Sequence, residues 1–188
     1  EIEYEDHTSP SIYVKFPFSD AAELLPDANA DVFVVIWTTT PWTLPANLGV
    51  CLHPDFTYAA VQTEKDGILI LAKEMVKQVM DEFGFENYSI VKEFSASQLE
   101  NKKCSHPFYD RDSLIVLGDH VTLEAGTGCV HTAPGHGADD HVVGKKYGLE
   151  CYSPVEDNGV FSKDVEFFNG QFIFKANPNI NQTLEDAG

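Results

Sequence analysis

Two stretches of this chain concentrate side chains that could bind and turn over a small polar substrate. The first, WTTTPWTLPAN at 37–47, holds four threonines, two tryptophans and two prolines and carries no charge. Prolines end strands, so sheet packing alone does not account for this run of hydroxyl groups. The second, GTGCVHTAPGHGADDH at 126–141, holds four glycines, three histidines and two adjacent aspartates. Glycine permits close backbone approach, and titratable groups surround it here, so the composition indicates a site and not a core.

Three kinds of site are compatible with the second stretch. A metal site would use His131, His136, Asp140 and His141, but their spacing matches no zinc motif, and the glycines and prolines prevent one helix from presenting them all. A phosphate-binding loop would need the Lys-Ser/Thr ending of a P-loop, which is absent. We favour a pocket lined by backbone, His131 and Asp140, and expect His136 and His141 at surface or capping positions.

The bulk composition is that of a globular protein with an acidic surface. The 188 residues suffice for one domain with a core, and 43% of them are hydrophobic. Lys and Arg total 12 against 30 Asp and Glu, a net charge of −18. Such a surface repels phosphate backbones, which argues against a free-standing nucleic-acid binder. It still allows a domain that receives a nucleic-acid end delivered by another part of a larger protein.

The cysteines and the chain ends bear on location and extent. Cys51, Cys104, Cys129 and Cys151 form no CxxC pair, which argues against zinc knuckles and fits a reducing cytoplasm. No apolar run approaches membrane-spanning length. The chain begins without methionine, so we expect one domain, 1–188, cut from a larger protein, with residues 1–10 in a connection to the remainder.

Hydrophobic periodicity predicts many short strands and a few short helices. Alternation over 11–18 and apolar runs over 31–37, 88–94 and 113–118 indicate strands, and 57–63 with 67–72 indicates a hairpin. One helical face is expected over 73–84, ended by Gly84, and further helices over 138–148 and 179–188. The pattern is typical of a β-rich α+β fold, with a closed barrel as one candidate arrangement.

The two stretches together closely resemble the editing domain of isoleucyl-tRNA synthetases, the insertion called connective polypeptide 1. The resemblance runs from TSPSIYVKFPF to FKAN, nearly the whole chain, and its GHGADD form is similar to the bacterial type. The leucyl and valyl relatives share the threonine loop but carry an Arg-acid pair where this chain has Trp42 and Thr43. The ATP-site motifs HIGH and KMSKS are absent, so the resemblance implies no aminoacylation by this fragment alone and ATP binding elsewhere in a full-length ligase.

The resemblance implies a fold and an activity. The fold would be a closed six-stranded β-barrel with short peripheral helices. The activity would be proofreading hydrolysis of mischarged valyl-tRNA(Ile), with valyl-adenylate as a further candidate substrate. The partners would be the 3′-terminal adenosine of that tRNA and the catalytic body of the same synthetase, in the cytoplasm, with no membrane, no cofactor in this domain and weak tRNA binding in isolation.

A second, hydrolytic site answers a selectivity problem. One methylene in an apolar pocket is worth only ~1–3 kcal/mol, a figure known from this class of synthetase and not deduced from the sequence. An editing pocket must therefore admit valine and exclude isoleucine by size, with rigid Trp, Pro and Thr walls. The resemblance implies Asp140, Thr39, Thr40 and His131 as catalytic positions, Trp37, Thr38, Thr43, Asn47 and Gly137 as substrate-binding positions, and no metal.

The roles follow from the substrate, an amino-acid ester with a free ammonium group. Asp140 would bind the ammonium by a charge-assisted hydrogen bond, and Asp139 would start a helix. The threonine hydroxyls would hold the ribose, the ester and an attacking water, with no protein nucleophile. His131 would wall the pocket, and its service as a general base is a weaker alternative. Rival readings are a metal-dependent hydrolase and a non-catalytic module that binds an amino acid or adenosine.

Overall fold

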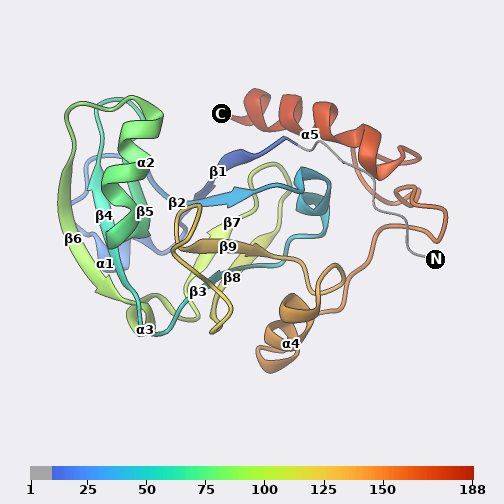
Figure 1. Ribbon diagram of the computed structural model, residues 1–188, viewed down its shortest axis with the longest axis horizontal. Coiled ribbons are helices and arrows are strands. Elements are labelled where there is room, and N and C mark those ends of the chain that lie inside the picture. The colour runs from blue at the N-terminus through green and yellow to red at the C-terminus, as the bar shows by residue number, and fades with distance from the viewer. Residues whose placement is uncertain (1–9) are drawn as a thin grey trace.

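The computed structural model describes residues 10–188, so all but Pro10 of the expected connection at 1–10 lies outside the described residues. Two β-sheets form the body, with α2 over one of them and α4 and α5 at the opposite end (Figure 1). The elements in chain order are β1 (Ile12–Pro17), α1 (Ala21–Leu24), β2 (Val32–Thr38), the 3-10 helix η1 (Pro41–Ala46), β3 (Gly49–Leu52), β4 (Thr57–Gln62), β5 (Ile68–Ala72), η2 (Lys73–Met75), α2 (Val76–Phe83), β6 (Ser89–Ser95), α3 (Ala96–Leu99), β7 (Lys103–Ser105), β8 (Asp112–Leu117), β9 (Cys129–Thr132), α4 (Ala138–Lys146) and α5 (Ile173–Ala187).

The larger sheet has the strand order β1-β2-β5-β4-β6 and carries most of the predicted strands. All of its pairings are antiparallel except the one between β2 and β5, which places Val34 opposite Ile70. The predicted hairpin is confirmed as β4 and β5. Every residue of β5 is buried, as expected for a central strand covered on both faces.

The smaller sheet has the order β7-β8-β3-β9 and is built from strands of three to six residues. β3 pairs in parallel with β8 and antiparallel with β9, which sets Val50 opposite His131 and Gly49 opposite Thr132. This strand pairing places the stretch 126–141 near the end of β2, where the stretch 37–47 begins (Figure 1).

The prediction of a closed six-stranded barrel is wrong. The described chain forms two mixed sheets, and although an isolated bridge between Phe18 and Cys104 links the end of β1 to β7, neither sheet closes into a barrel. β2 and β9 contact each other without a hydrogen-bonded ladder, because Thr127 lies between the sheets. Its Oγ1 donates to the Val35 carbonyl at 2.7 Å, and its own carbonyl accepts the Ala72 N–H at 2.8 Å. Backbone groups that would close a barrel are thus satisfied by one loop residue.

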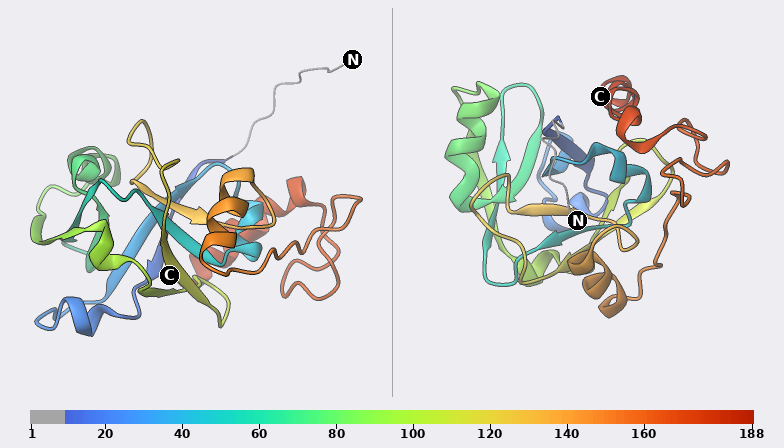
Figure 2. Two further views of the ribbon diagram at one scale, coloured as in Figure 1. Left: turned by 90° about the horizontal axis from the view of Figure 1, so that it is seen from below. Right: turned by 45° about the vertical axis from the view of Figure 1, so that its right-hand side comes forward.

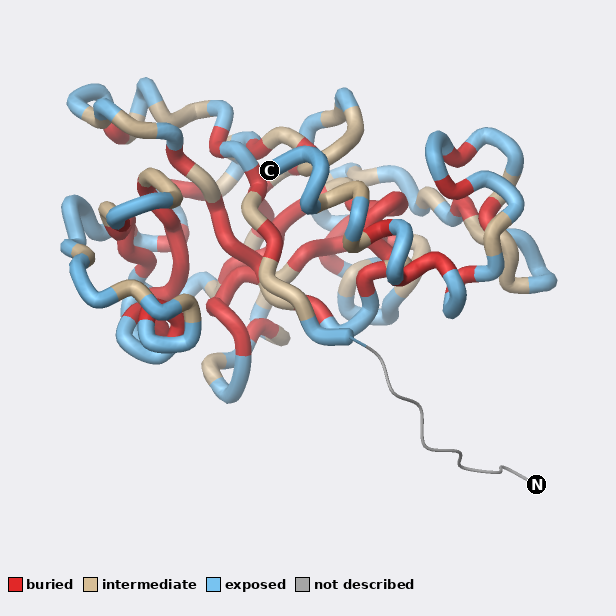
Figure 3. Tube along the Cα trace, turned by 90° about the horizontal axis from the view of Figure 1, so that it is seen from above, coloured by how far each residue is buried: buried red, intermediate tan, exposed pale blue. Residues whose placement is uncertain are grey.

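The three longer helices were predicted, with a changed start for the last of them, and the short helices α1 and α3 were not predicted. In α2, Val76, Val79 and Met80 are buried, and the helix ends at Gly84 in the left-handed conformation with φ 75°. The last helix begins at Ile173 and not near Asn179, because Pro178 is accommodated inside it. Figure 3 shows buried segments running through the middle of the molecule, with exposed segments around its outside.

A second, smaller apolar cluster fixes α4 against the smaller sheet. It consists of Cys51, Val116, Val121 and Val143. Gly144 allows this close contact, because a Cβ atom there would lie 2.7 Å from Pro134 Cγ. The second half of α4, where Val143 and Gly144 lie, is therefore held beside the smaller sheet and Pro134. Within residues 10–188, no helix has the length and apolar character needed to span a bilayer.

Thr127→Val tests the hydrogen bonds by which Thr127 links β2 and β5 to the loop before β9, which we call the seam. The variant keeps the shape of the side chain but leaves the Val35 carbonyl without its donor and the Cys129 N–H without its 3.2 Å acceptor. We expect the free energy of unfolding to fall by about 1–3 kcal/mol in urea denaturation. Thr57→Val, at an exposed position of β4, should change it by less than about 0.5 kcal/mol. Equal effects of the two substitutions would contradict the seam.

Candidate functional site

The threonine segment is a strand end that turns directly into a 3-10 helix. β2 ends at Thr38, whose Oγ1 accepts the Thr40 N–H at 3.1 Å, and η1 begins at Pro41. Proline suits a first helical position because its φ is preset and it has no N–H to satisfy. Thr38 is buried, while Thr39 and Thr40 are exposed. The turn therefore presents Thr39 and Thr40 at its open side.

The buried end of this helix receives side-chain hydrogen bonds from the segment between β7 and β8. His106 Nε2 lies 2.8 Å from the Leu44 carbonyl, and its Nδ1 accepts the N–H groups of Phe108 and Tyr109. Arg111 Nη1 donates to the carbonyls of Pro45 and Asn47 at 2.8 and 3.1 Å. The Pro45 and Asn47 carbonyls thus gain a partner, and the Leu44 carbonyl, which already accepts the Asn47 N–H at 3.0 Å, gains a second one.

His131, on β9, is held from both sides by residues of the threonine segment. Its Nδ1 lies 3.2 Å from Asn47 Nδ2, which also donates to the Gly49 carbonyl, and its Nε2 lies 2.7 Å from Thr43 Oγ1. Because an amide nitrogen can only donate, Nδ1 is the acceptor and Nε2 carries the proton. The Thr43 hydroxyl then accepts from Nε2 and gives its own proton to the Thr40 carbonyl at 2.8 Å.

This network keeps His131 neutral. Burial and, to a smaller extent, neighbouring His136 lower the pKa of His131 from 6.5 to about 4. Both ring nitrogens are engaged within the protein, so neither is available to take a proton from water without breaking a hydrogen bond. The geometry suits a fixed wall and a support for Thr43.

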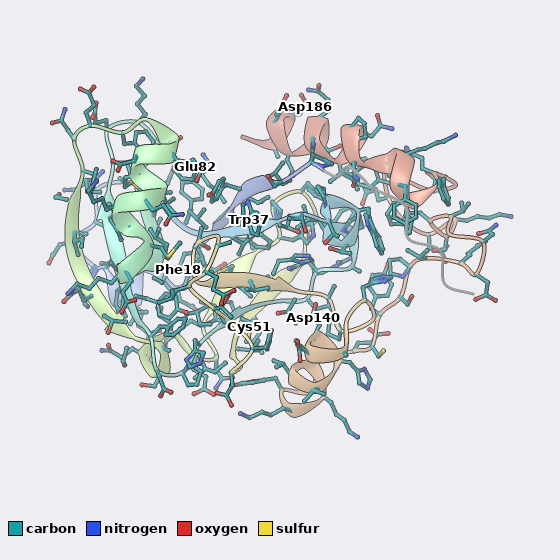
Figure 4. All side chains as sticks on the ribbon, in the orientation of Figure 1. Phe18, Trp37, Cys51, Glu82, Asp140 and Asp186 are labelled. Carbon is teal, nitrogen blue, oxygen red and sulfur yellow. The ribbon has the colours of Figure 1, made fainter. Side chains whose placement is uncertain are left out.

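Asp140 lies in the first turn of α4, on the far side of the same hollow. Its Oδ2 accepts the Ala133 N–H at 3.1 Å. Burial raises the pKa of this carboxyl group, while the Ala133 N–H and His120 act to lower it. Gly137 leaves room for the carboxylate, because a Cβ atom there would lie 3.3 Å from Asp140 Cγ. Figure 4 shows Asp140 at the start of α4 and Trp37 on β2.

These elements enclose a pocket of about 410 Å³. Seven of the nine predicted site residues line it: Trp37, Thr38, Thr39, Thr40, Thr43, His131 and Asp140. The other two do not line the pocket but contact residues that do. Asn47 is fully buried and lies within hydrogen-bonding distance of His131, and Gly137 leaves room for the Asp140 carboxylate. A second cavity of about 460 Å³ lies beside Tyr13 and Phe83 and contains none of these residues.

The turn before β9 supplies a wall that the sequence did not reveal. Gly126 has φ +81°, and a Cβ atom there would lie 3.2 Å from Trp37 Cβ, so the glycine lets the loop lie directly on this tryptophan. Cys129 also lines the pocket, but burial raises the pKa of its thiol. A reactive thiolate is therefore disfavoured at this position.

Two further histidines line the pocket. His136 was expected at the surface or in a cap, and His120 had no signal beyond its place in a polar turn. Within residues 10–188 neither Nε2 atom has a hydrogen-bond partner. Burial lowers the pKa of His136, whose ring packs edge to face on Trp42 at 5.4 Å. His141 is exposed and lies outside the pocket.

Three of the four candidate metal ligands, His131, His136 and Asp140, line the same pocket, but they do not form a metal-binding group. Among the described residues, no group of three or more His, Cys, Asp or Glu side chains could hold a metal ion. His131 uses both ring nitrogens within the protein, and His141 points away.

Comparison with curated proteins gives relatives of one kind. The isoleucine–tRNA ligase of Syntrophotalea carbinolica is 58% identical over 190 residues, covering 100% of this chain and 20% of the relative. That of Bacillus cereus is 53% identical over 188 residues, again 100% of this chain and 20% of the relative. The chain thus spans about a fifth of the length of these relatives. No family model matches the chain.

Comparison with solved structures supports the fold. The crystal structure of GlLeuRS-CP1 has a TM-score of 0.72 at 17% identity, covering 94% of this chain and 96% of that one. The editing domain of the cytosolic leucyl-tRNA synthetase of P. falciparum has a TM-score of 0.72 at 10% identity, covering 94% and 97%. At these identities the likeness concerns the fold alone.

The hydrogen-bond network predicts the tautomer and the titration of His131. Nitrogen-detected NMR at pH 5 should find a neutral ring with the proton on Nε2. A proton on Nδ1, or a titration midpoint near 6.5, would show that the network does not form. Because burial lowers the pKa of His131 to about 4, the unfolded chain takes up this proton first as the pH falls. The stability due to the neutral ring should be present above pH 6.5 and lost between 6.5 and about 4.

Proposed function

This chain is the counterpart of the editing-domain segment of bacterial isoleucine–tRNA ligases, and from that premise we propose that it hydrolyses the aminoacyl ester of valyl-tRNA(Ile). The further candidate substrate is valyl-adenylate. Both carry a valyl group with a free ammonium, joined through an activated carbonyl to adenosine or its phosphate. Aminoacylation and ATP binding would belong to the remaining four-fifths of the ligase.

The observation that carries the proposal is a half-buried, hydrogen-bonded carboxylate in the same pocket as a hydroxyl-rich loop. Asp140 lines the same pocket as Thr39 and Thr40, and Oδ2 is already fixed by the Ala133 N–H. A fixed carboxylate binds an ammonium group by a charge-assisted hydrogen bond. The other acidic residue in the pocket lining is Glu124. The valyl ammonium would therefore bind at Asp140, with its carbonyl directed toward the threonine turn.

Catalysis would come from positioning an attacking water. Hydroxyls of Thr39 and Thr40 at the open side of the turn can both donate to an ester oxygen and accept from water. Holding the water molecule close to the ester carbonyl and correctly oriented would raise the hydrolysis rate without a covalent intermediate. The substrate's own vicinal ribose hydroxyl would assist. Because both nitrogens of His131 are engaged, we favour this direct attack over general-base catalysis by His131.

Rigid walls would provide the size limit. Trp37 is backed by Gly126, and Thr43 and His131 hold each other at 2.7 Å, so the side of the pocket between β2 and β9 has little freedom to widen. An aliphatic side chain one methylene longer than valine would need such a shift. This arrangement is what a sieve that admits valine and excludes isoleucine requires.

The remaining parts of the proposal concern partners. The tRNA would be gripped by the catalytic body of the same ligase, and this domain would receive its last nucleotide. With a net charge of −18, the isolated chain should bind bulk tRNA weakly. Cofactor-independent activity and a cytoplasmic location stay predictions.

Asp140→Asn separates the ammonium site from the fold. Asparagine can still accept the Ala133 N–H, but it has no charge for the ammonium. In calorimetry with the non-hydrolysable valyl-3′-amino-adenosine, we expect affinity to fall roughly ten- to hundredfold, the worth of a charged hydrogen bond. Asp139→Asn is the matched control, because Asp139 is the exposed neighbour that does not line the pocket.

Each outcome of that comparison is informative. Equal affinity in the Asp140 and Asp139 variants would remove Asp140 from the site. Because burial raises the pKa of Asp140, binding to the unsubstituted chain should weaken as the pH falls toward that pKa. Binding without any hydrolysis of the corresponding ester, even in a full-length ligase, would favour the non-catalytic module. Chelator-sensitive hydrolysis would favour the metal-dependent enzyme.

His131→Ala tests the size limit. Removing the imidazole opens the wall between Thr43 and Asn47. The isoleucyl-3′-amino-adenosine, excluded by the unsubstituted chain, should then bind within about tenfold of the valyl compound. Circular dichroism must first confirm that the variant folds. Continued rejection of the isoleucyl compound by a folded variant would place the size limit elsewhere in the pocket.

A further inference from the structure

A row of aromatic rings leads from the wall of the pocket to the protein surface. The aromatic row consists of His136, Trp42, Phe174 and Phe172. Trp42 contacts His136 at 5.4 Å and Phe174 at 6.2 Å, and Phe174 contacts Phe172 at 5.4 Å, all edge to face. These distances lie in the favourable range for aromatic pairs. The row joins three elements far apart in sequence: the turn before α4, η1 and the start of α5.

The outer rings are exposed and yet firmly placed. Phe174 is 49% exposed and Phe172 is 39% exposed. Phe172 forms a backbone bridge with Val160, and its ring lies on Gly159, where a Cβ atom would be 2.9 Å from Phe172 Cε2. α5 itself packs on η1, and Figure 2 shows the two side by side. A ring fixed from beneath, with outer surface exposed, is a preorganised platform for a planar ligand.

The row also occupies a part of this acidic chain that carries no net charge. Residues 32–54 and 125–138 contain no Asp, Glu, Lys or Arg. Residues 158–184 contain two acids and two lysines, which balance. The net charge of −18 therefore resides on other segments. Acidic residues nevertheless border these segments, namely Glu124, Asp139, Asp140, Glu156, Asp157, Glu185 and Asp186, so the favourable contribution expected from the row is stacking and not charge.

We propose that the aromatic row stacks the unpaired nucleotides that precede the terminal adenosine of the substrate, guiding a single strand into the pocket. This inference rests on the proposed function. Aromatic side chains bind single-stranded nucleic acid without sequence preference, because every base has a face to stack. The continuity of the row with the pocket wall favours a strand that ends in the pocket over a protein partner.

The test compares two ligands that differ only in the preceding nucleotides. One is valyl-3′-amino-adenosine, and the other is a cytidine-cytidine-adenosine trinucleotide with the same valyl amide at its 3′ end. Calorimetry with the full chain should give a trinucleotide affinity roughly fivefold or more above that of the adenosine compound. The gain should change little with salt, because it comes from stacking and not from phosphate neutralisation.

Variants of the aromatic row test which side chains give the trinucleotide its higher affinity. The double variant Phe172→Ala, Phe174→Ala should lose it while binding the adenosine compound as before. Phe167→Ala is the matched control, because Phe167 is 55% exposed but stacks on Tyr109 away from the row. Thermal unfolding of each variant confirms that it folds.

The outcomes separate this inference from the proposed function. If the adenosine compound binds but the trinucleotide shows no gain, or the gain survives in the double variant, the proposed function stands and the aromatic row is overturned as a nucleotide platform. A gain lost equally in the Phe167 variant would also overturn it. If neither ligand binds, the proposed function and this inference fall together.

Discussion

The pocket depends on one constraint, which is that a buried, proline-rich turn must have its polar groups satisfied. η1 contributes Pro41 and Pro45 and is almost wholly buried, so its carbonyls cannot rely on water. His106 and Arg111 supply donors beneath it, and Asn47 and His131 close the network beside it. Once these hydrogen bonds are made, the threonine turn has one conformation. The hydroxyls at its open side are then fixed without any metal or disulfide.

The same hydrogen bonds divide the pocket into a neutral side and a charged side. His131 is kept neutral by donors and burial, and the threonine turn has no ionisable group. Asp140 stands opposite, on a helix anchored by Val143 and by its own contact with the Ala133 N–H. A positively charged group that entered the pocket would be attracted to its acidic residues, Asp140 and Glu124, and not to the uncharged threonine turn.

Local patterns could be predicted from the sequence, and contacts between distant segments could not. Gly84 ended its helix as expected, and the hairpin of β4 and β5 followed from alternation and a turn. The barrel was wrong because nothing in the pattern says that Thr127 takes the hydrogen bonds between the sheets. The two motifs met in one pocket as the resemblance implied, whereas His120 was missed because no spacing distinguishes it. Asn47 proved to be a support for His131, which depends on a residue 84 positions away.

The seam at Thr127 also governs how the site comes into being during folding. It links Val35 of β2 and Ala72 of β5 to the loop before β9, and Val35 and Thr127 lie 92 residues apart in the chain. Contacts so distant in sequence form late, because the loop entropy must be overcome first. A chain emerging from the ribosome would have its threonine turn long before Asp140. The complete pocket therefore needs the chain as far as Asp140, and it cannot form on a nascent chain before that part has been made.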